Sequence, residues 1–382
     1  MTYSTMHSIT ISIVAAALLS AGVTACAHGA PVVLTKPGTT TYIRQMQMGP
    51  DGHLCIVGQV VDPDGDLQPR GTVILFSTEK NQVLWQQTVD SPDDSSGNRF
   101  VACRSDGKAT YVAANVETQS QRTLSQSLAY VYQFDAAGKV AGRKELVTGA
   151  ANSFVYDIDM DGKGVGVVGM ANDRKANGDT NAIFFASLDR GLRMATYTRL
   201  ATGAYQSDAV VRLSGNVALL GGNFAPASVA KDDLPEDYAV SRIVAGKYQF
   251  SVRPQKARPD DVGTAITPAG EFVSLGAPAK ATTLTVVGAD GKLAETRPIQ
   301  SKFCLTRSLS ADTAAVYAIR LSCSKSQEPA RLVQIDRKTG VESLVPGVTG
   351  EPQRVLAVDG GALVVVRKGN GSLVLQSVGK GT

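Results

Sequence analysis

The sequence predicts an all-β fold built from seven repeated units, and three observations lead to this prediction. A tight-turn dipeptide recurs along the chain at intervals of 42 to 55 residues. A short apolar segment suited to the centre of a sheet follows each of these turns. Most units then contain a second turn, so that each unit comprises two hairpins. Recurrence with such a period is typical of repeat folds in which every unit is one small sheet.

The first turn of each unit contains residues that suit a two-residue hairpin. Glycine adopts a positive φ without steric penalty, which is the conformation these turns need. The dipeptides are Asp51-Gly52, Asp106-Gly107, Asp161-Gly162, Ser214-Gly215, Ala269-Gly270, Ala311-Asp312 and Asp359-Gly360. They predict one hairpin in each of seven units.

The apolar segments after these turns predict seven central strands. They span residues 54–57, 109–112, 165–168, 217–220, 272–275, 315–318 and 363–366. A second turn follows at residues 135–138, 189–191, 245–246, 290–291 and 338–340. Two hairpins make four antiparallel strands, which is the composition of one β-propeller blade.

The two ends of the chain predict how the ring closes. The seventh unit, residues 354–379, contains three predicted strands, while residues 32–35 form a strand without a partner. Pairing residues 32–35 with 372–375 would remove two exposed sheet edges at once. We therefore predict a seven-bladed β-propeller closed by the N-terminal strand. Its expected divisions are a signal segment with a lipobox (1–26), a leader with the closing strand (27–41) and the propeller (42–382). A sandwich or a two-domain β fold is the alternative.

The second hairpins carry a family resemblance. Residues 71–85 (GTVILFSTEKNQVLW) and 331–345 (RLVQIDRKTGVESLV) resemble the quinoprotein-type repeats of bacterial periplasmic and lipoprotein propellers. Trp85 stands where that family has a docking tryptophan, whereas later units have Thr196 or Glu295 nearby. The resemblance implies a propeller. It does not extend to dehydrogenase activity, because the vicinal disulfide that those enzymes stack on their cofactor has no counterpart here, and we predict no cofactor.

The N-terminus predicts export. Residues 9–23 form an apolar run that is shorter than the roughly 20 residues of a membrane-spanning helix, as expected of a signal peptide. Residues 23–26 resemble a bacterial lipobox, which implies cleavage before Cys26 and acylation of that residue. The alternative is cleavage within residues 25–30, which would release a soluble periplasmic protein. We expect a periplasmic lipoprotein anchored to the outer membrane, since Ala27 follows the cysteine.

Export places the remaining cysteines in an oxidising compartment, where disulfides form. These cysteines are Cys55, Cys103, Cys304 and Cys323. Four cysteines allow three pairings. We favour Cys55 with Cys103 and Cys304 with Cys323, because each pair falls in one unit or in neighbouring units.

Loop lengths predict where a partner binds. The connection between the second and third strands lies on the face opposite both tight turns. It is long in units one to four, at residues 62–71, 117–127, 171–180 and 223–238, and short in units five to seven. Long loops on a rigid scaffold are where binding residues concentrate. Neutral loop drift is the alternative, because insertions in loops cost little.

The candidate binding residues on these loops mix carboxylates, basic groups and aromatic rings, as protein interfaces do. They are Asp62, Asp64, Asp66, Arg70, Arg174, Lys175, Phe224, Asp232, Asp233, Glu236, Asp237 and Tyr238. The alternating carboxylates from Asp62 to Asp66 could ligate Ca²⁺. Gly65 is misplaced for an EF-hand, so we expect a solvated turn and no metal.

Several function classes are disfavoured by the sequence. Its 38 basic and 34 acidic residues are spread along the chain without a basic block, so no nucleic-acid partner is expected. The three histidines, His7, His28 and His53, lie in the signal, the leader and a turn. No nucleophile elbow, P-loop or zinc-protease motif occurs, and we assign no catalytic residue.

These observations predict a monomeric, non-enzymatic protein-binding lipoprotein of the bacterial envelope. Its partner would be another envelope or periplasmic protein, which it binds as an assembly scaffold or as an immunity-type inhibitor, and it would touch the membrane only through its lipid anchor. The alternative is a periplasmic lyase or glycosidase that acts on saccharide with carboxylates such as Asp208, Asp232 and Glu236.

Overall fold

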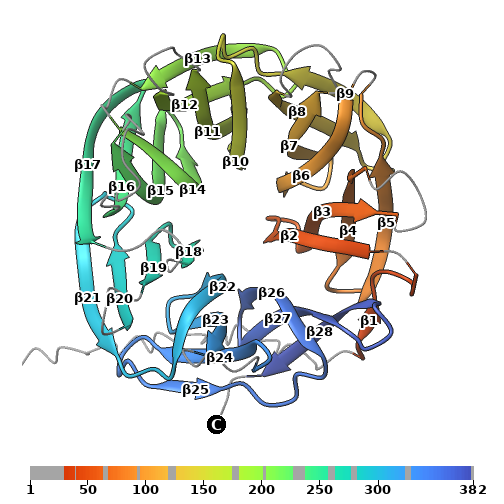
Figure 1. Ribbon diagram of the computed structural model, residues 1–382, viewed down its shortest axis with the longest axis vertical. Coiled ribbons are helices and arrows are strands. Elements are labelled where there is room, and N and C mark those ends of the chain that lie inside the picture. The colour runs from red at the N-terminus through yellow and green to blue at the C-terminus, as the bar shows by residue number, and fades with distance from the viewer. Residues whose placement is uncertain are drawn as a thin grey trace, which may run out of the picture.

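The chain forms a ring of seven four-stranded antiparallel sheets around a central opening (Figure 1). This computed structural model describes residues 30–38, 40–62, 68–92, 95–118, 126–173, 180–200, 204–226, 237–256, 263–276, 282–322 and 328–379. Every described element is a strand. The arrangement confirms the predicted seven-bladed propeller.

Blades 1 to 6 each use four consecutive strands, ordered from the channel outwards. Blade 1 is β2 (Thr40–Met48), β3 (His53–Val61), β4 (Arg70–Ser77) and β5 (Gln82–Val89). Blade 2 is β6 (Ser95–Ser105), β7 (Ala109–Thr118), β8 (Ser127–Asp135) and β9 (Val140–Glu145). Blade 3 is β10 (Asn152–Met160), β11 (Val165–Asp173), β12 (Thr180–Leu188) and β13 (Met194–Leu200).

The second half of the ring follows the same plan. Blade 4 is β14 (Ala204–Ser214), β15 (Val217–Pro226), β16 (Asp237–Val244) and β17 (Lys247–Lys256). Blade 5 is β18 (Gly263–Ile266), β19 (Phe272–Gly276), β20 (Thr282–Val287) and β21 (Leu293–Ile299). Blade 6 is β22 (Phe303–Ala311), β23 (Ala315–Ser322), β24 (Arg331–Asp336) and β25 (Glu342–Leu344). Blade 7 is β26 (Glu351–Val358), β27 (Gly361–Arg367), β28 (Leu373–Gly379) and β1 (Val32–Val33).

The N-terminal strand completes the last blade, as predicted. Val33 lies opposite Val374 in the antiparallel pairing of β1 with β28. Beyond the strand, the Leu34 backbone N–H donates to the Leu373 carbonyl at 2.8 Å. The Leu34 side chain is buried in the apolar cluster between blades 7 and 1. The ring is therefore closed by a short antiparallel pairing and by the burial of the Leu34 side chain.

The apolar core is divided among the blade interfaces. Seven clusters of buried residues each draw on two neighbouring blades, so that the ring is held by face-to-face packing of sheets. Trp85 on β5 stacks on Phe134 of the next blade, with ring centroids 5.9 Å apart. A Cβ atom on Gly138 would lie 2.6 Å from the Trp85 ring. Trp85 thus docks on its neighbour, the position that the repeat resemblance implied for it.

A disulfide between Cys55 on β3 and Cys103 on β6 staples blade 1 to blade 2, with Cα atoms 6.3 Å apart. It is one of the two pairings favoured from the sequence. Cys304 lies on β22, whereas its expected partner Cys323 is outside the described residues, as are the signal segment and Cys26. In the part of the chain that is described, no helix has the length and apolarity to cross a bilayer.

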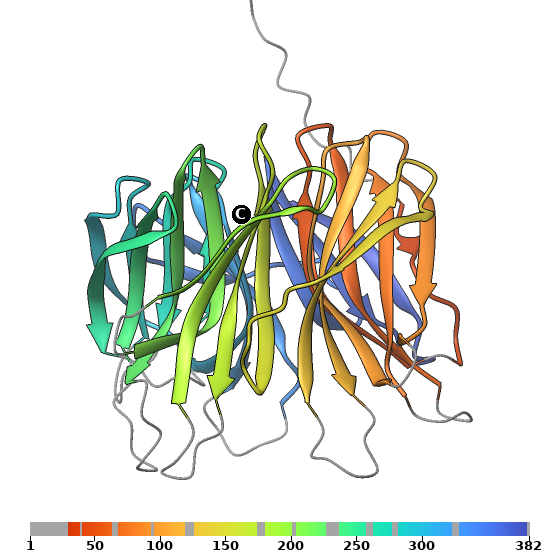
Figure 2. The ribbon, with the colours of Figure 1, turned by 90° about the horizontal axis from the view of Figure 1, so that it is seen from above.

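The two faces of the ring, seen edge-on in Figure 2, differ in their connections. On one face the strands are joined by tight turns, and glycines such as Gly52 and Gly107 adopt φ of 75° and 79° there. The second strands of blades 1 to 4 end, and the third strands begin, on the other face, as expected. Residues 62–69, 119–126, 174–179 and 227–236 connect these strand ends, and most of them are outside the described residues. One expectation was wrong. The connection 323–330 of blade 6 is as long as those of blades 1 and 2, because β24 begins only at Arg331.

Candidate functional site

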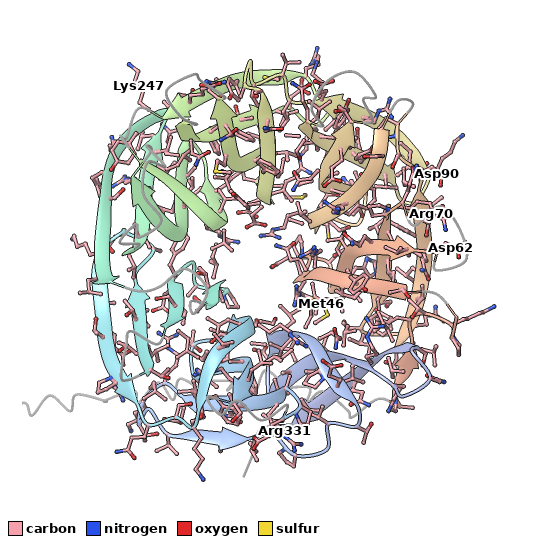
Figure 3. The ribbon with its side chains drawn as sticks, in the orientation of Figure 1. Met46, Asp62, Arg70, Asp90, Lys247 and Arg331 are labelled. Atoms are coloured by element: carbon pink, nitrogen blue, oxygen red, sulfur yellow. A yellow bond between two sulfur atoms is a disulfide. The ribbon has the colours of Figure 1, made fainter. Side chains whose placement is uncertain are left out.

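The central channel forms a cavity of about 1020 Å³. Its wall is made by the inner strand of every blade, namely β2, β6, β10, β14, β18, β22 and β26. In Figure 3, Met46 of β2 lies near the opening, while Asp62, Arg70 and Lys247 lie at the periphery. The channel therefore collects side chains from all seven repeats.

A β-bulge recurs in the wall. Six of the seven inner strands shift register against the second strand of their blade, and β18 is the exception. A bulge adds one residue to a strand and interrupts the alternation of side chains. In β2 the shift lies between Ile43 and Gln45, and in β22 between Thr306 and Ser308. The residues inside these two shifts, Arg44 and Arg307, both line the channel.

The wall contributed by blades 2 and 3 contains paired charges. Arg104 on β6 lies 3.0 Å from Asp159 and 3.7 Å from Asp157, both on β10. Both carboxylates are buried, and they accept the backbone N–H groups of Leu213 and Val211 on blade 4 at 2.8 and 2.9 Å. Burial raises the pKa of Asp157, although Arg104 opposes the shift. These acids join three blades.

Side chains bridge other blades in the same way. The Gln45 side chain accepts the Cys103 N–H at 2.9 Å and donates to Asp157 at 2.8 Å. Between blades 6 and 7, the Ser310 hydroxyl accepts the Ala357 N–H at 2.8 Å. An inner strand has no sheet partner on its channel side, so these bonds satisfy N–H groups that would otherwise need water. Much of the polar lining is therefore structural.

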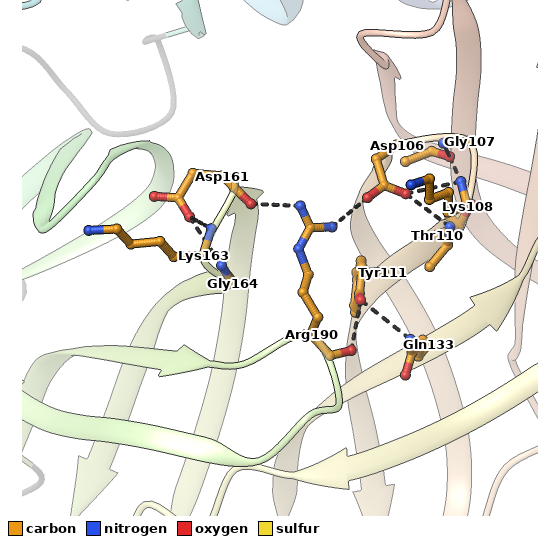
Figure 4. Close-up of polar contacts among 12 residues, drawn as sticks. Asp106, Gly107, Lys108, Thr110, Tyr111, Gln133, Asp161, Lys163, Gly164 and Arg190 are labelled. Carbon is orange, nitrogen blue, oxygen red and sulfur yellow. Dashed lines mark hydrogen bonds and ion pairs between the residues drawn. The ribbon is translucent and has the colours of Figure 1, made fainter.

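The tight-turn end of the channel has a second ion pair, shown in Figure 4. Arg190 of blade 3 contacts the Asp106 carboxylate of blade 2 at 2.6 Å and donates to the Asp161 carbonyl at 2.6 Å. Burial alone would raise the pKa of Asp106, but hydrogen bonds from the Ala109 and Lys108 backbone, together with Arg190, bring it below its ordinary value. Arg190 thus links the tight turn of blade 2 that contains Asp106 to the tight turn of blade 3 that contains Asp161.

Across the channel, blades 6, 7 and 1 present three arginines that the sequence analysis did not identify. The Arg354 guanidinium donates to the carbonyls of Arg44 at 2.7 Å and Gln353 at 2.8 Å. Arg307 pairs with Glu351 at 2.8 Å. Burial, together with the charges of Arg44 and Arg307, lowers the pKa of Arg354 to about 10. No described carboxylate forms an ion pair with Arg44 or Arg354.

The candidate loop residues fall into two separate groups. Asp62 follows β3 and Arg70 begins β4, both at the same end of blade 1, where Arg70 lies 3.8 Å from Asp90 (Figure 3). In blade 4, Phe224 is paired with Asp237, and Tyr238 follows on β16. These two groups share a face but lie on blades across the ring, so the structure does not bring them together. Asp64, Asp66, Arg174, Lys175, Asp232, Asp233 and Glu236 lie outside the described residues.

Nothing in the described ranges forms a metal centre or a histidine-based catalytic site. No group of three or more His, Cys, Asp or Glu side chains lies close enough there to hold a metal ion. His53 is placed at a tight turn, where its Nδ1 lies 2.7 Å from the Asp51 carboxylate. Most of the Asp62 to Asp66 segment is outside the described residues, so the expectation of a solvated turn rather than a calcium site is not tested.

Comparison with known proteins assigns the fold class and nothing finer. The sequence matches no protein-family model and no curated protein. The β-propeller domain of the Trilobed protease from Pyrococcus furiosus is similar in structure, with a TM-score of 0.54 and 11% identity over 89% of this chain and 95% of that one. That domain is described as having an open velcro topology, whereas β1 closes the ring here.

A second similar structure is the acylaminoacyl peptidase of Pyrococcus horikoshii, with a TM-score of 0.53 and 11% identity over 88% of this chain. The match spans 51% of that chain, about half of its length. At this level of identity the two similarities support the propeller fold alone. The protein is therefore a β-propeller, and its function has to be argued from its own residues.

Proposed function

We propose that this protein is a non-enzymatic, protein-binding propeller of the bacterial envelope. It binds an envelope or periplasmic protein as an assembly scaffold or an immunity-type inhibitor, and acylated Cys26 anchors it to the outer membrane. The difference between the two faces is the observation that carries the proposal. One face has tight turns only, while the other has every connection longer than five residues, on a rigid ring of packed sheets.

The state of the two buried carboxylates of the channel wall favours binding over carboxylate catalysis. A lyase or glycosidase needs an acid and a base that can reach the substrate. Asp157 is 1% exposed and Asp159 is 3% exposed, and both accept backbone N–H groups of the next blade. They are engaged in holding the ring together. The other candidates for this chemistry, Asp208, Asp232 and Glu236, lie where the structure describes no side chain.

Site-specific photocrosslinking tests the binding face. A benzophenone amino acid replaces Asp62 in the full-length protein in cells, and a second variant carries it at Tyr238. Thr339, an exposed residue in a tight turn on the opposite face, is the matched control. We expect one partner to be crosslinked from both loop positions and not from Thr339. Crosslinking from Thr339 alone, or turnover of a saccharide by the purified protein without any crosslinked partner, would overturn the proposal.

The anchor is tested separately by Cys26→Ser. Two or three acyl chains hold a protein on a bilayer because each buried CH₂ contributes roughly 0.8 kcal/mol. The variant should therefore move from the membrane fraction to the soluble periplasmic fraction. If the unmodified protein is already soluble, the lipoprotein part of the proposal is wrong, whereas the binding face is unaffected.

A further inference from the structure

We propose that the channel wall formed by blades 6, 7 and 1 is a binding site for an oxyanion, a carboxylate or phosphate group of a small solute, held by Arg44, Arg307 and Arg354. This site is distinct from the loop face on which the proposed protein partner binds. It rests on three arginines that line the same part of the channel wall, on the contacts of the Arg354 guanidinium with the backbone of the other two, and on the charges around them.

Arg354 lies at the centre of the site. Its Nε donates to the Arg44 carbonyl at 2.7 Å, and its Nη1 lies 3.5 Å from the Arg307 carbonyl. The Arg354 side chain on blade 7 therefore extends from blade 6 to blade 1. The residue whose backbone carbonyl it contacts is an arginine on each side. All three line the central cavity. Arg44 and Arg307 are exposed to the solvent of the channel.

The charges in this part of the wall are not balanced. Among the described residues only Glu351 forms an ion pair with any of the three arginines, and it contacts Arg307. The hydrogen bonds of Arg354 go to carbonyl oxygens, which satisfy its N–H groups but leave its formal charge without a counter-ion. Like charges held close together at reduced solvent exposure destabilise one another. Burial is the main cause of the lowered pKa of Arg354, and the charges of Arg44 and Arg307 lower it further.

On blades 2 and 3, across the channel, the charged arginine side chains are paired with carboxylates. Arg104 has Asp157 and Asp159, and Arg190 has Asp106. An arginine cluster with one carboxylate for its three guanidinium groups, in a cavity open to solvent, is suited to an anion from outside the chain. Guanidinium groups bind carboxylate and phosphate through pairs of parallel hydrogen bonds, so both chemistries fit.

The size of the cavity indicates that the oxyanion is part of a larger molecule. About 1020 Å³ is more than a single phosphate or carboxylate fills. The hydroxyls of Ser308 and Ser310 and the amide of Gln47 belong to the same wall and lie within the set of residues that line the cavity. They would contact uncharged polar atoms next to the anionic group. The expected solute is therefore small, polar and anionic.

Isothermal titration calorimetry of the purified protein at constant ionic strength tests the site. Pyrophosphate is the probe in one arm and citrate in the other, so that the arms separate a phosphate ligand from a carboxylate ligand. We expect saturable binding with one site per chain for at least one probe. Arg44→Gln should weaken that binding about ten-fold or more, because it removes charge-assisted hydrogen bonds. Arg212→Gln is the matched control, since Arg212 is an exposed arginine that lines the channel from β14.

A thermal melt provides a second readout that does not depend on the choice of probe. In chloride buffer of low ionic strength, Arg44→Gln should raise the melting temperature by about a degree, because it relieves the repulsion of Arg354. Arg212→Gln should leave it unchanged. A residue with only a structural role would lower the melting temperature when it is replaced.

Two results would overturn the proposal. One is equal weakening of binding by Arg44→Gln and Arg212→Gln, which would indicate attraction by the whole channel rather than a site. The other is the absence of binding by both probes at millimolar concentration. Neither result bears on the loop face, since the crosslinking positions there are remote from the three arginines.

Discussion

Two parts of the channel wall are both built from inner strands of the blades, but they differ in how their charges are balanced. On blades 2 and 3 the charged groups are buried and paired, and their remaining oxygens accept backbone N–H groups of the next blade. On blades 6, 7 and 1 the arginines gather around one another with a single carboxylate, Glu351. The comparison teaches that polar residues in a propeller channel are of two kinds. Paired ones hold the ring together, and unpaired ones are available to a ligand.

The first way to sharpen this comparison is to remove the disulfide that joins blade 1 of the arginine wall to blade 2 of the paired wall. Replacing both Cys55 and Cys103 by alanine should lower the free energy of unfolding by roughly 3 to 4 kcal/mol, because the disulfide closes a long loop of the unfolded chain. The separation of the two cysteines is 48 residues. Urea denaturation measures the change. An unchanged midpoint would show that packing alone fixes blade 1 on blade 2.

The second prediction concerns the buried acid of the paired wall. Asp157→Ala should destabilise the fold by about 3 kcal/mol, because it leaves the Val211 N–H and the Gln45 amide without their acceptor in a buried site and removes one of the two carboxylates of Arg104. Asp161→Ala is the control, since that carboxylate caps an exposed turn and its loss should cost about 1 kcal/mol. If both variants unfold at the same denaturant concentration, the paired wall is not structural.

The third prediction concerns the junction of blades 7 and 1, where the N-terminal segment is held by apolar packing. Leu34→Ala should cost about 2 kcal/mol, because the side chain is 4% exposed and fills the cluster between blades 7 and 1. Its neighbour Val33 is 59% exposed, so Val33→Ala should change the unfolding free energy very little. Equal effects of the two substitutions would mean that the N-terminal segment is not docked as described.

The fourth and smallest effect is a pH dependence of the paired wall. Burial raises the folded-state pKa of Asp157 above its ordinary value of 3.8. As the pH rises through that value, the unfolded chain releases this proton while the folded chain retains it. Stability is therefore lost with rising pH up to the raised pKa. The side chain in Asp157→Asn does not titrate. The free energy of unfolding of the unmodified protein, relative to that of this variant, should therefore decline from about pH 4 upwards. A difference that is independent of pH would contradict the burial argument.

Much of the fold could be predicted from the sequence because its signals are local. The Asp-Gly turns and the apolar segments after them occur within a few residues, and together they locate the seven sheets. The pairing of residues 32–35 with 372–375 could be inferred because one unit lacks a strand and the other end of the chain has one to spare. The length of the blade 6 connection was misjudged, although residues 323–330 (CSKSQEPA) are mostly polar and include a proline, as loops do.

The channel site could not be predicted, for a physical reason. A strand alternates its side chains between two faces, so a sequence predicts direction only as long as the alternation holds. Arg44 and Arg307 lie inside bulges that break it, whereas Arg354 is paired with Val365 next to the bulge of its own strand. The alternation therefore does not predict that these three residues line the same part of the channel. The pairing of Arg104 with Asp157 and Asp159 likewise joins residues of different blades and has no local signature.

Closure of the ring is the claim on which both walls depend, and an engineered disulfide tests it most directly. Val33 and Val374 are opposite residues of the antiparallel pair β1 and β28, where Cα atoms are roughly 4.5 to 5.5 Å apart and a disulfide can form. In the variant Val33→Cys with Val374→Cys, peptide mapping by mass spectrometry should find this link within a single chain in nearly all molecules. Free thiols at both positions, or a link between two chains, would contradict closure by the N-terminal strand.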